Sequence, residues 1–307
     1  MPDKCGLLFP GYGAQHVGMG KDFYDDYRVV QELFEEAGNC TGTNFVKLCF
    51  ASSEKELAKP HNAYLALFVV QASLFAVMRE HGFEPSLMAG WGVGYISAHY
   101  AAGVLSFPDG LYMLGKYVTF FTQMKQERDV VIVRLIGIDR RTLEELIVCH
   151  ALQSQVKLAI VYRPTDCVVV GSRLAMEHLK RTCLPYAAVV RDVAFSYGLH
   201  SLCVDEFVAR VRTYLEKIDC RVIRFPIINQ EGMLFNAGDR MDKEAILRFF
   251  YYPIDVVSVV KQLRSCSRLV HVGMGAVTHE IIMHHLPELT FDDFYQKKDV
   301  RKICNEY

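Results

Sequence analysis

The chain has 307 residues, of which 51% are hydrophobic and 22% are charged, and these proportions are typical of a compact globular protein. Its formal net charge of −1 argues against nucleic-acid binding, which requires clustered positive charge. We find no apolar run close to the ~20 residues of a membrane span, and no long apolar leader near Met1. These features favour a cytoplasmic protein that binds neither nucleic acid nor a membrane.

The first 120 or so residues alternate short apolar strands with helical patterns. In chain order the pattern predicts a strand at 6–9, a helix at 24–38, a long helix at 62–81, a strand at 87–89 and helices at 96–102 and 109–125. Strands that alternate with helices in this way form a parallel sheet covered by helices. The N-terminal part is therefore predicted to be an α/β domain.

The pattern changes after residue 129. It predicts a strand at 130–135, a helix at 141–150, strands at 157–161 and 167–170, a helix at 174–182 and a strand at 187–192. This β-α-β-β-α-β order is that of a ferredoxin-like unit. A helix at 200–217, a strand ending at Ile228 and closing helices then return the chain to the first domain. We predict a large α/β domain of residues 1–127 and 198–307 and a small α+β subdomain of residues 128–197.

Neither the cysteines nor the histidines form a metal site. The chain has ten cysteines, scattered from Cys5 to Cys304 without a C-x-x-C pair, so we interpret them as reduced, small hydrophobic residues. His279 and His284 lie five positions apart rather than four, so one helix face does not present both to zinc. We predict no metal ion and no cofactor.

Three glycines between the strand at 87–89 and the next helix have the spacing of a nucleophile elbow. In the pattern glycine-x-serine-x-glycine, a strained turn projects the serine into the active site. Here Gly90 and Gly94 take the outer positions, and Gly92 stands where the serine belongs. Alternating glycines also occur in ordinary loops, so the interpretation depends on the rest of the chain. If it holds, the elbow has no nucleophile.

The rest of the chain resembles malonyl-CoA:acyl carrier protein transacylases. Residues 7–20 resemble the opening FPGQGSQ and VGMG of that family, and residues 90–107 resemble its segment GHSLGEYSALYAAGVLSF. Residues 198–201, 225–229 and 270–275 are similar to its G-x-F-H-S, P-V-x-N and E-V-G-P-G segments. The resemblance covers nearly the whole chain in order. It implies an α/β-hydrolase-like large domain with a parallel sheet and a small ferredoxin-like subdomain.

The resemblance also assigns roles to residues. In the family a serine attacks an acyl-CoA thioester with a histidine as base, and the carrier protein then removes the acyl group; two backbone amides stabilise the oxyanion. The base position is His200, the nucleophile position is Gly92, and the oxyanion amides are those of Tyr12 and Val93. Asn229 takes the position whose backbone carbonyl orients the histidine.

Other positions of the family motif hold aromatic residues in this chain. The arginine that binds the malonyl carboxylate through its planar guanidinium falls on Tyr117. Trp91 replaces the histidine before the serine, Tyr95 replaces the glutamate after the elbow, and Tyr64 lies near the position of a glutamine. Together with Tyr12, these side chains predict one cavity narrowed by five aromatics, which argues against CoA thioester binding.

Each of these residues also has a purely structural interpretation. Trp91 could fill core volume, Tyr12 and Tyr95 could be surface aromatics, and His200 could be a polar residue at a helix start. Ser97 lies five residues beyond the elbow and is expected to point away from it. Ser201 follows the base position, so it is not expected to replace the nucleophile.

Three functions remain open at this point. The chain could be an inactive transacylase homologue that binds an acyl carrier protein or a synthase component as a scaffold. It could be a thioester-processing transferase or hydrolase of fatty acid or polyketide synthesis, in which His200 activates water. It could also be a conventional malonyltransferase with a misread elbow, which would need a serine at another position.

Overall fold

The computed structural model describes residues 4–127, 129–186, 189–193 and 204–304. The strands are β1 (Cys5–Phe9), β2 (Leu87–Gly90), β3 (Val130–Ile136), β4 (Val156–Arg163), β5 (Asp166–Ser172), β6 (Val189–Asp192), β7 (Ile227–Ile228), β8 (Leu234–Phe235), β9 (Ile254–Asp255), β10 (Arg268–Val272) and β11 (Thr290–Phe294). The helices before the second sheet are α1 (Lys21–Asp26), α2 (Arg28–Thr41), α3 (Phe45–Phe50), α4 (Glu54–Leu57), α5 (Pro60–Glu80), α6 (Val93–Ala101) and α7 (Phe107–Glu127). The later helices are α8 (Arg140–Cys149), α9 (Arg173–Cys183), α10 (Val204–Leu215), α11 (Lys243–Leu247), the 3-10 helix η1 (Arg248–Phe250), α12 (Val256–Leu263), α13 (Ala276–His285) and α14 (Lys298–Cys304).

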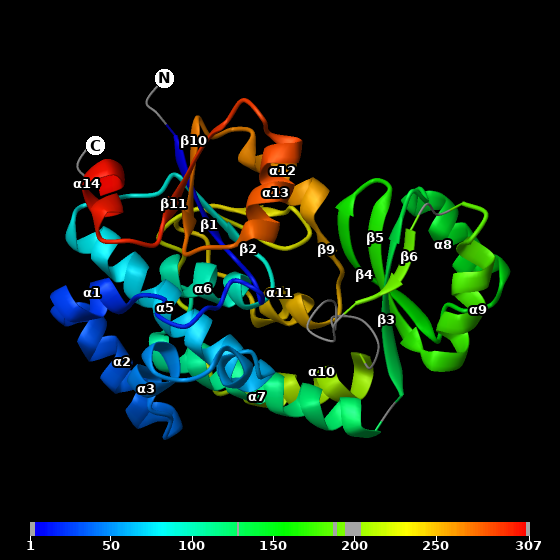
Figure 1. The fold of residues 1–307 in the computed structure, drawn as a ribbon, viewed down its shortest axis with the longest axis horizontal. Coiled ribbons are helices and arrows are strands. Elements are labelled where there is room, and N and C mark those ends of the chain that lie inside the picture. Colours follow the sequence, from blue (N-terminus) through cyan, green and yellow to red (C-terminus); the bar gives the residue numbers. More distant parts are fainter. Residues whose placement is uncertain (1–3, 128, 187–188, 194–203, 305–307) are drawn as a thin grey trace.

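One sheet has six strands in the order β11-β10-β1-β2-β7-β8 (Figure 1). Its neighbouring strands are parallel, except that β8 runs antiparallel to β7. The predicted parallel sheet is therefore confirmed. The C-terminal part contains the predicted closing helices, and it also contains β10 and β11, which the pattern did not predict and which extend the sheet beyond β1. A short apolar run such as Leu269–Val272 fits a strand or a buried helix turn equally well by periodicity.

Helices cover both faces of this sheet (Figure 1). One face carries α2, α5, α6 and α7, and their apolar side chains form a large core with Leu7 and Phe9 of β1. In the described part of the chain, α5 is the one helix long and apolar enough to cross a membrane. Of its most apolar 18-residue stretch, 83% is buried inside the protein. This corrects the expectation that no apolar run approaches that length; α5 is the central core helix.

The single helix predicted at 24–38 is two helices in the structure. At Tyr27 the backbone is extended, with φ −115° and ψ 120°, and the Tyr27 N–H donates to the carbonyl of Phe23 to end α1. α2 then begins at Arg28. The apolar spacing continues across this break, and for this reason the sequence pattern did not reveal it.

The second sheet has the order β6-β3-β5-β4-β9. Strands β3 to β6 pair antiparallel, and α8 and α9 are the two crossover helices. This is the predicted ferredoxin-like arrangement. The short strand β9, from much later in the chain, adds a parallel neighbour to β4. We propose, as predicted, that residues 1–127 and 198–307 form one domain and residues 128–197 the other.

A second apolar core joins the two sheets. It contains Leu8 and Trp91 from the first sheet and its elbow, and Ile160 and Val168 from the second. Polar contacts add to it: the His285 side chain lies 2.9 Å from the carbonyl oxygen of Tyr162. The cores on the two faces of the six-stranded sheet are thus different, and only one of them includes the second sheet.

Candidate functional site

The turn between β2 and α6 is built as an elbow. Gly92 stands there with φ 60° and ψ −131°, a conformation that glycine adopts readily and other residues rarely. A nucleophile elbow imposes this kind of strain on its central residue. A Cβ atom added to Gly92 would have one neighbour within 4 Å, the Cα of Gly11 at 3.7 Å. The turn therefore has space for the Cβ atom of the serine that the sequence lacks.

The two outer glycines are required by main-chain contacts. A Cβ on Gly90 would lie 2.2 Å from the carbonyl oxygen of Gly94, and a Cβ on Gly94 would lie 2.0 Å from the carbonyl oxygen of Phe9. Backbone atoms cannot move aside as a flexible side chain can. The close packing of β1, β2 and α6 therefore explains the glycine spacing that identified the elbow.

The loop after β1 lies beside the turn. Gly11 contacts the main chain of Trp91, because a Cβ on Gly11 would be 2.8 Å from the Trp91 carbonyl oxygen. Two side chains hold this loop: the amide of Gln71 donates to the carbonyl of Pro10 at 2.8 Å, and the hydroxyl of Tyr12 donates to the carbonyl of Ala58 at 2.7 Å.

The predicted oxyanion positions flank this arrangement. Val93 is the first residue of α6, so its N–H has no acceptor within the helix. Tyr12 follows Gly11 in the loop beside Gly92. The structure thus places the backbone of both residues next to the turn, and their role as oxyanion donors stays a prediction.

Three tyrosines that the family motif places near the site form one row of rings. Tyr12 packs against Tyr64 with ring centroids 5.8 Å apart, and Tyr64 packs against Tyr117 at the same distance. We call Tyr12, Tyr64 and Tyr117 the tyrosine row. Tyr64 and Tyr117 are buried, and burial raises the pKa of both phenols above the ordinary value. Tyr64 and Tyr117 are therefore uncharged at neutral pH, and the row offers no cation to a carboxylate.

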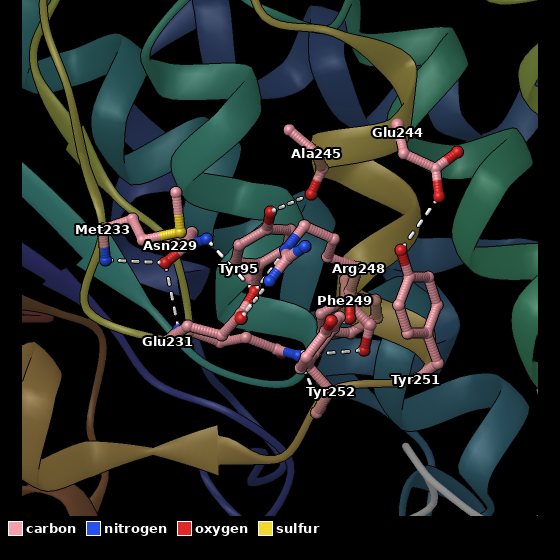
Figure 2. Close-up of polar contacts among 11 residues, drawn as sticks. Tyr95, Asn229, Glu231, Met233, Glu244, Ala245, Arg248, Phe249, Tyr251 and Tyr252 are labelled. Atoms are coloured by element: carbon pink, nitrogen blue, oxygen red, sulfur yellow. Dashed lines mark hydrogen bonds and ion pairs between the residues drawn. The ribbon is translucent and has the colours of Figure 1, made fainter.

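Tyr95 lies in the core rather than on the surface (Figure 2). It is 1% exposed, stacks on Phe249 with ring centroids 4.9 Å apart, and donates through its hydroxyl to the carbonyl of Ala245 at 3.3 Å. Phe249 in turn contacts Tyr117 at 5.7 Å. The surface interpretation of Tyr95 was wrong, because its helix α6 is buried on all sides.

Trp91 is separated from these rings. It is 8% exposed and belongs to the core that joins the two sheets, together with Ala89 and Ile132. The structural interpretation of Trp91 as a core side chain is therefore confirmed. The expectation of five aromatics around one cavity was wrong for Trp91, because side chains alternate between the faces of a sheet and Trp91 continues the Ala89 side.

Asn229 closes the turn that follows β7 (Figure 2). Its side-chain oxygen accepts the N–H groups of Glu231 at 3.0 Å and Met233 at 2.8 Å. Its backbone carbonyl accepts the N–H of Gly232 at 3.0 Å. Because β7 runs parallel to β2, the turn after β7 and the elbow after β2 lie at the same end of the sheet. His200 and Ser201, the predicted base and its neighbour, lie outside the described residues, so the orienting role of Asn229 stays a prediction.

An ion pair that the sequence did not reveal lies beside Asn229. Arg248 binds Glu231 through two hydrogen bonds of 2.7 and 2.5 Å, and its guanidinium lies 3.9 Å from the ring centroid of Tyr252 (Figure 2). Hydrogen bonds to the Glu231 carboxylate raise the pKa of Arg248. The pair ties the turn after β7 to η1. No spacing in the sequence connects positions 231 and 248.

Two further polar residues of α6 are buried. The Ser97 hydroxyl donates to the carbonyl of Val93 at 3.3 Å within its own helix; that it points away from the turn stays a prediction. His99 donates through Nδ1 to the carbonyl of Tyr95 at 2.7 Å, and its Nε2 lies 3.1 Å from the sulfur of Met241. Burial lowers the pKa of His99 to about 4, so this imidazole is neutral near pH 7.

Comparison with known proteins gives a consistent result. The family model described as acyl transferase domain matches residues 7–286. The malonyl CoA-acyl carrier protein transacylase of Bacillus subtilis (strain 168) is 25% identical over 290 residues, which cover 91% of this chain and 89% of that protein.

Solved structures share the fold. The acyl carrier protein S-malonyltransferase from Vibrio cholerae superposes with a TM-score of 0.89 at 21% identity, covering 98% of this chain and 99% of its own. A malonyl-transacylase described in complex with its type II PKS acyl-carrier protein gives 0.85 at 22% identity, covering 99% and 100%. With a family model matched over most of its length, the chain belongs to the acyl transferase domain family, and malonyl-CoA:acyl carrier protein transacylases are among its homologues.

Proposed function

We propose that this protein binds an acyl carrier protein, or a synthase component that contains one, without forming an acyl-enzyme. The observation that carries the proposal is Gly92 at the centre of an intact elbow. Covalent acyl transfer needs a nucleophile at that turn. In a well-studied serine hydrolase, loss of the serine alone lowers kcat by about a million-fold.

The tyrosine row supports the same proposal. A malonyl carboxylate needs a cation such as arginine for bidentate binding, and this chain has the buried phenol of Tyr117 at that position. Burying a carboxylate against apolar rings without a cation is unfavourable. Even with a nucleophile, malonyl selectivity would therefore be lost.

The partner follows from the relatives. Their names specify an acyl carrier protein, and one solved structure is described as a complex with such a protein. This chain has the same fold over nearly its whole length. We therefore propose that this protein still binds the carrier protein but no longer transfers an acyl group. We propose further that it takes part in fatty acid or polyketide synthesis in the cytoplasm.

The acyl-enzyme part of the proposal is tested by intact-protein mass spectrometry after incubation with malonyl-CoA and with acetyl-CoA. The samples are the native protein, Gly92→Ser, and Gly92→Ala as the control that adds a Cβ without a nucleophile. We expect no adduct on the native protein or on Gly92→Ala. An adduct on the native protein would show another nucleophile and contradict the proposal.

The serine variant then locates the defect. An acetyl adduct restricted to Gly92→Ser would show that the rest of the site still works and that the missing hydroxyl alone prevents acylation. No adduct on any sample would show that the tyrosine row also closes the acyl site. Both results agree with the proposal and assign the loss to different residues.

The partner is tested by titrating the native protein with holo acyl carrier protein in a calorimeter. We expect saturable binding that does not change with Gly92→Ala. Absence of binding would remove the carrier protein from the proposal. Steady hydrolysis of acyl thioesters by the native protein, abolished by His200→Ala, would instead establish the hydrolase alternative.

A further inference from the structure

A cavity that the elbow does not use lies between the loop after β1 and the beginnings of α1 and α14. Its outer chamber has a volume of about 590 Å³, opens to solvent and is lined by residues that include Lys21, Tyr295 and Lys298. An inner chamber of about 20 Å³ shares His16, Met19, Gly20, Met274 and Tyr295 with the outer one. Figure 1 places α1 and α14 on the side of the six-stranded sheet that faces away from the second sheet.

Among the residues that line the inner chamber alone, Gln71 has the one polar side chain. The residues that line it alone are Pro10, Ala14, Leu67, Val70, Gln71, Leu74 and Gly273. Gln71 is 1% exposed; its Nε2 donates to the carbonyl of Pro10 at 2.8 Å. Its Oε1 is buried and has no hydrogen-bond partner among the described residues. A buried acceptor without a donor is unfavourable, so this oxygen favours a ligand that ends in a donor group.

The size of the inner chamber limits that group. A volume of about 20 Å³ holds one water-sized group, since roughly 10–15 Å³ is the minimum for a water molecule. A hydroxyl fits, and a ring or a branched end does not. The methylene chain that carries this hydroxyl therefore lies outside the inner chamber, beside Met19 and Met274, which line both chambers.

The outer chamber favours an anion at the other end. Its acidic side chains are already engaged: Asp25 pairs with Lys21 at 2.6 Å, and Asp22 accepts the backbone N–H of Lys297 at 2.6 Å. Lys297 itself pairs with Asp26. Lys298 lines the chamber, is exposed, and forms no ion pair with any described residue. Its ammonium is the group left for a ligand carboxylate.

We propose that this cavity binds a short unbranched hydroxycarboxylate, with the hydroxyl donating to Gln71 Oε1 and the carboxylate accepting from Lys298. Met19 and Met274 contact the chain between the two ends, since flexible thioethers adapt to such ligands. The Gln71 amide also holds Pro10, next to the loop that flanks Gly92. The ligand therefore contacts Gln71, the side chain that supports this loop through Pro10. This site is separate from the elbow.

The test is calorimetric titration of the full chain with ω-hydroxycarboxylates from hydroxypropanoate to hydroxyhexanoate. The matched alkanoates lack the hydroxyl, and the matched alkanediols lack the carboxylate. We expect one hydroxycarboxylate to bind with a Kd about tenfold lower than either analogue of the same length, because each end contributes a charge-assisted or buried hydrogen bond. Equal affinity of all three classes, or no heat with any of them, would overturn the proposal.

Two variants locate the ligand. Lys298 is exposed, and Lys298→Gln is expected to remove most of the preference for the hydroxycarboxylate over the diol. The matched control is Lys157→Gln, at an exposed lysine in the other sheet, which should leave binding unchanged. Gln71→Met is expected to remove the preference for the hydroxyl. If Gln71→Met does not fold, Lys298→Gln still decides: unchanged binding in that variant means that the ligand lies elsewhere and the proposal is wrong.

Discussion

The elbow and the tyrosine row lie next to each other, and they differ in what determines their structure. At the elbow, contacts between main-chain atoms of Phe9, Gly90 and Gly94 set the geometry, and the side chain at position 92 has no part in them. In the tyrosine row, contacts between side-chain rings determine the geometry. A turn made by the backbone keeps its shape without a functional side chain, whereas the shape of a cluster made by side chains depends on which side chains are present.

The largest effect is expected at Gly94. In Gly94→Ala the new Cβ would lie 2.0 Å from the carbonyl oxygen of Phe9 and 2.7 Å from that of Pro10, and these backbone atoms cannot move aside. We expect a loss of about 4 kcal/mol or more of unfolding free energy, in the exceptional range for one substitution. Urea denaturation measures it.

Gly115→Ala is the matched control in the interior of α7. A Cβ there would have no atom within 4 Å, and alanine is favoured over glycine in a helix by about 0.5–1 kcal/mol. We therefore expect a small gain in stability. If Gly94→Ala were as well tolerated as Gly115→Ala, the main-chain explanation of the elbow would be wrong.

The next largest effect tests the tyrosine row. Tyr117 is 3% exposed and contacts Tyr64, Phe249 and Phe250. We expect Tyr117→Ala to cost about 3–4 kcal/mol, as for other large aromatic side chains removed from a core. Tyr117→Phe should cost much less, because it keeps the ring and its packing contacts. Thermal or urea unfolding distinguishes a packed row from an open pocket, in which both variants would be nearly neutral.

His99 extends the comparison to pH. Its pKa is about 4 in the folded protein against an ordinary value of 6.5. Above that ordinary value both states are neutral and His99 contributes nothing. Between pH 6.5 and about 4, His99 is protonated in the unfolded chain but stays neutral in the folded protein. Acidification over this range therefore lowers the unfolding free energy by roughly 3 kcal/mol in all.

The measurement is urea denaturation between about pH 7 and pH 4 for the native protein and His99→Gln. The native protein should lose more stability on acidification than the variant does. Burial also lowers the pKa of His271, which acts in the same direction, so the variant keeps part of the pH dependence. Parallel curves would contradict the assignment to His99.

The smallest effect is expected at the centre of the elbow. In Gly92→Ser the Cβ atom at position 92 meets no clash, but a residue with a side chain at φ 60° and ψ −131° costs on the order of 1–2 kcal/mol in backbone strain. A loss as large as that of Gly94→Ala would show that position 92 is packed after all. The same denaturation series measures both variants.

Much of this arrangement could be predicted from the sequence. The glycine spacing located the elbow because tight main-chain contacts leave no other residue possible at Gly90 and Gly94. The alternation of strands and helices predicted both sheets. Mapping onto the family motif predicted five aromatics around one cavity; of these, the structure brings Tyr12, Tyr64 and Tyr117 into ring contact.

Other features depend on contacts between distant segments. Strand β9 has two residues and no pattern of its own, and the pair of Glu231 and Arg248 is formed by two turns whose sequences are independent. The side of the sheet to which Trp91 points depends on strand register, which a single aromatic residue does not determine. Such features need the packed chain because no local signal encodes them.

Strand β9 has a consequence for the order in which the chain folds. The outer edge of β4 receives its parallel neighbour only from Ile254 and Asp255, far downstream of the other strands of that sheet. Until Ile254 and Asp255 have been synthesised, this edge of the second sheet has no neighbouring strand. An unpaired edge strand can pair with another chain. Truncation shortly before Pro253 should therefore yield a product that aggregates, even though every residue of the ferredoxin-like unit is present.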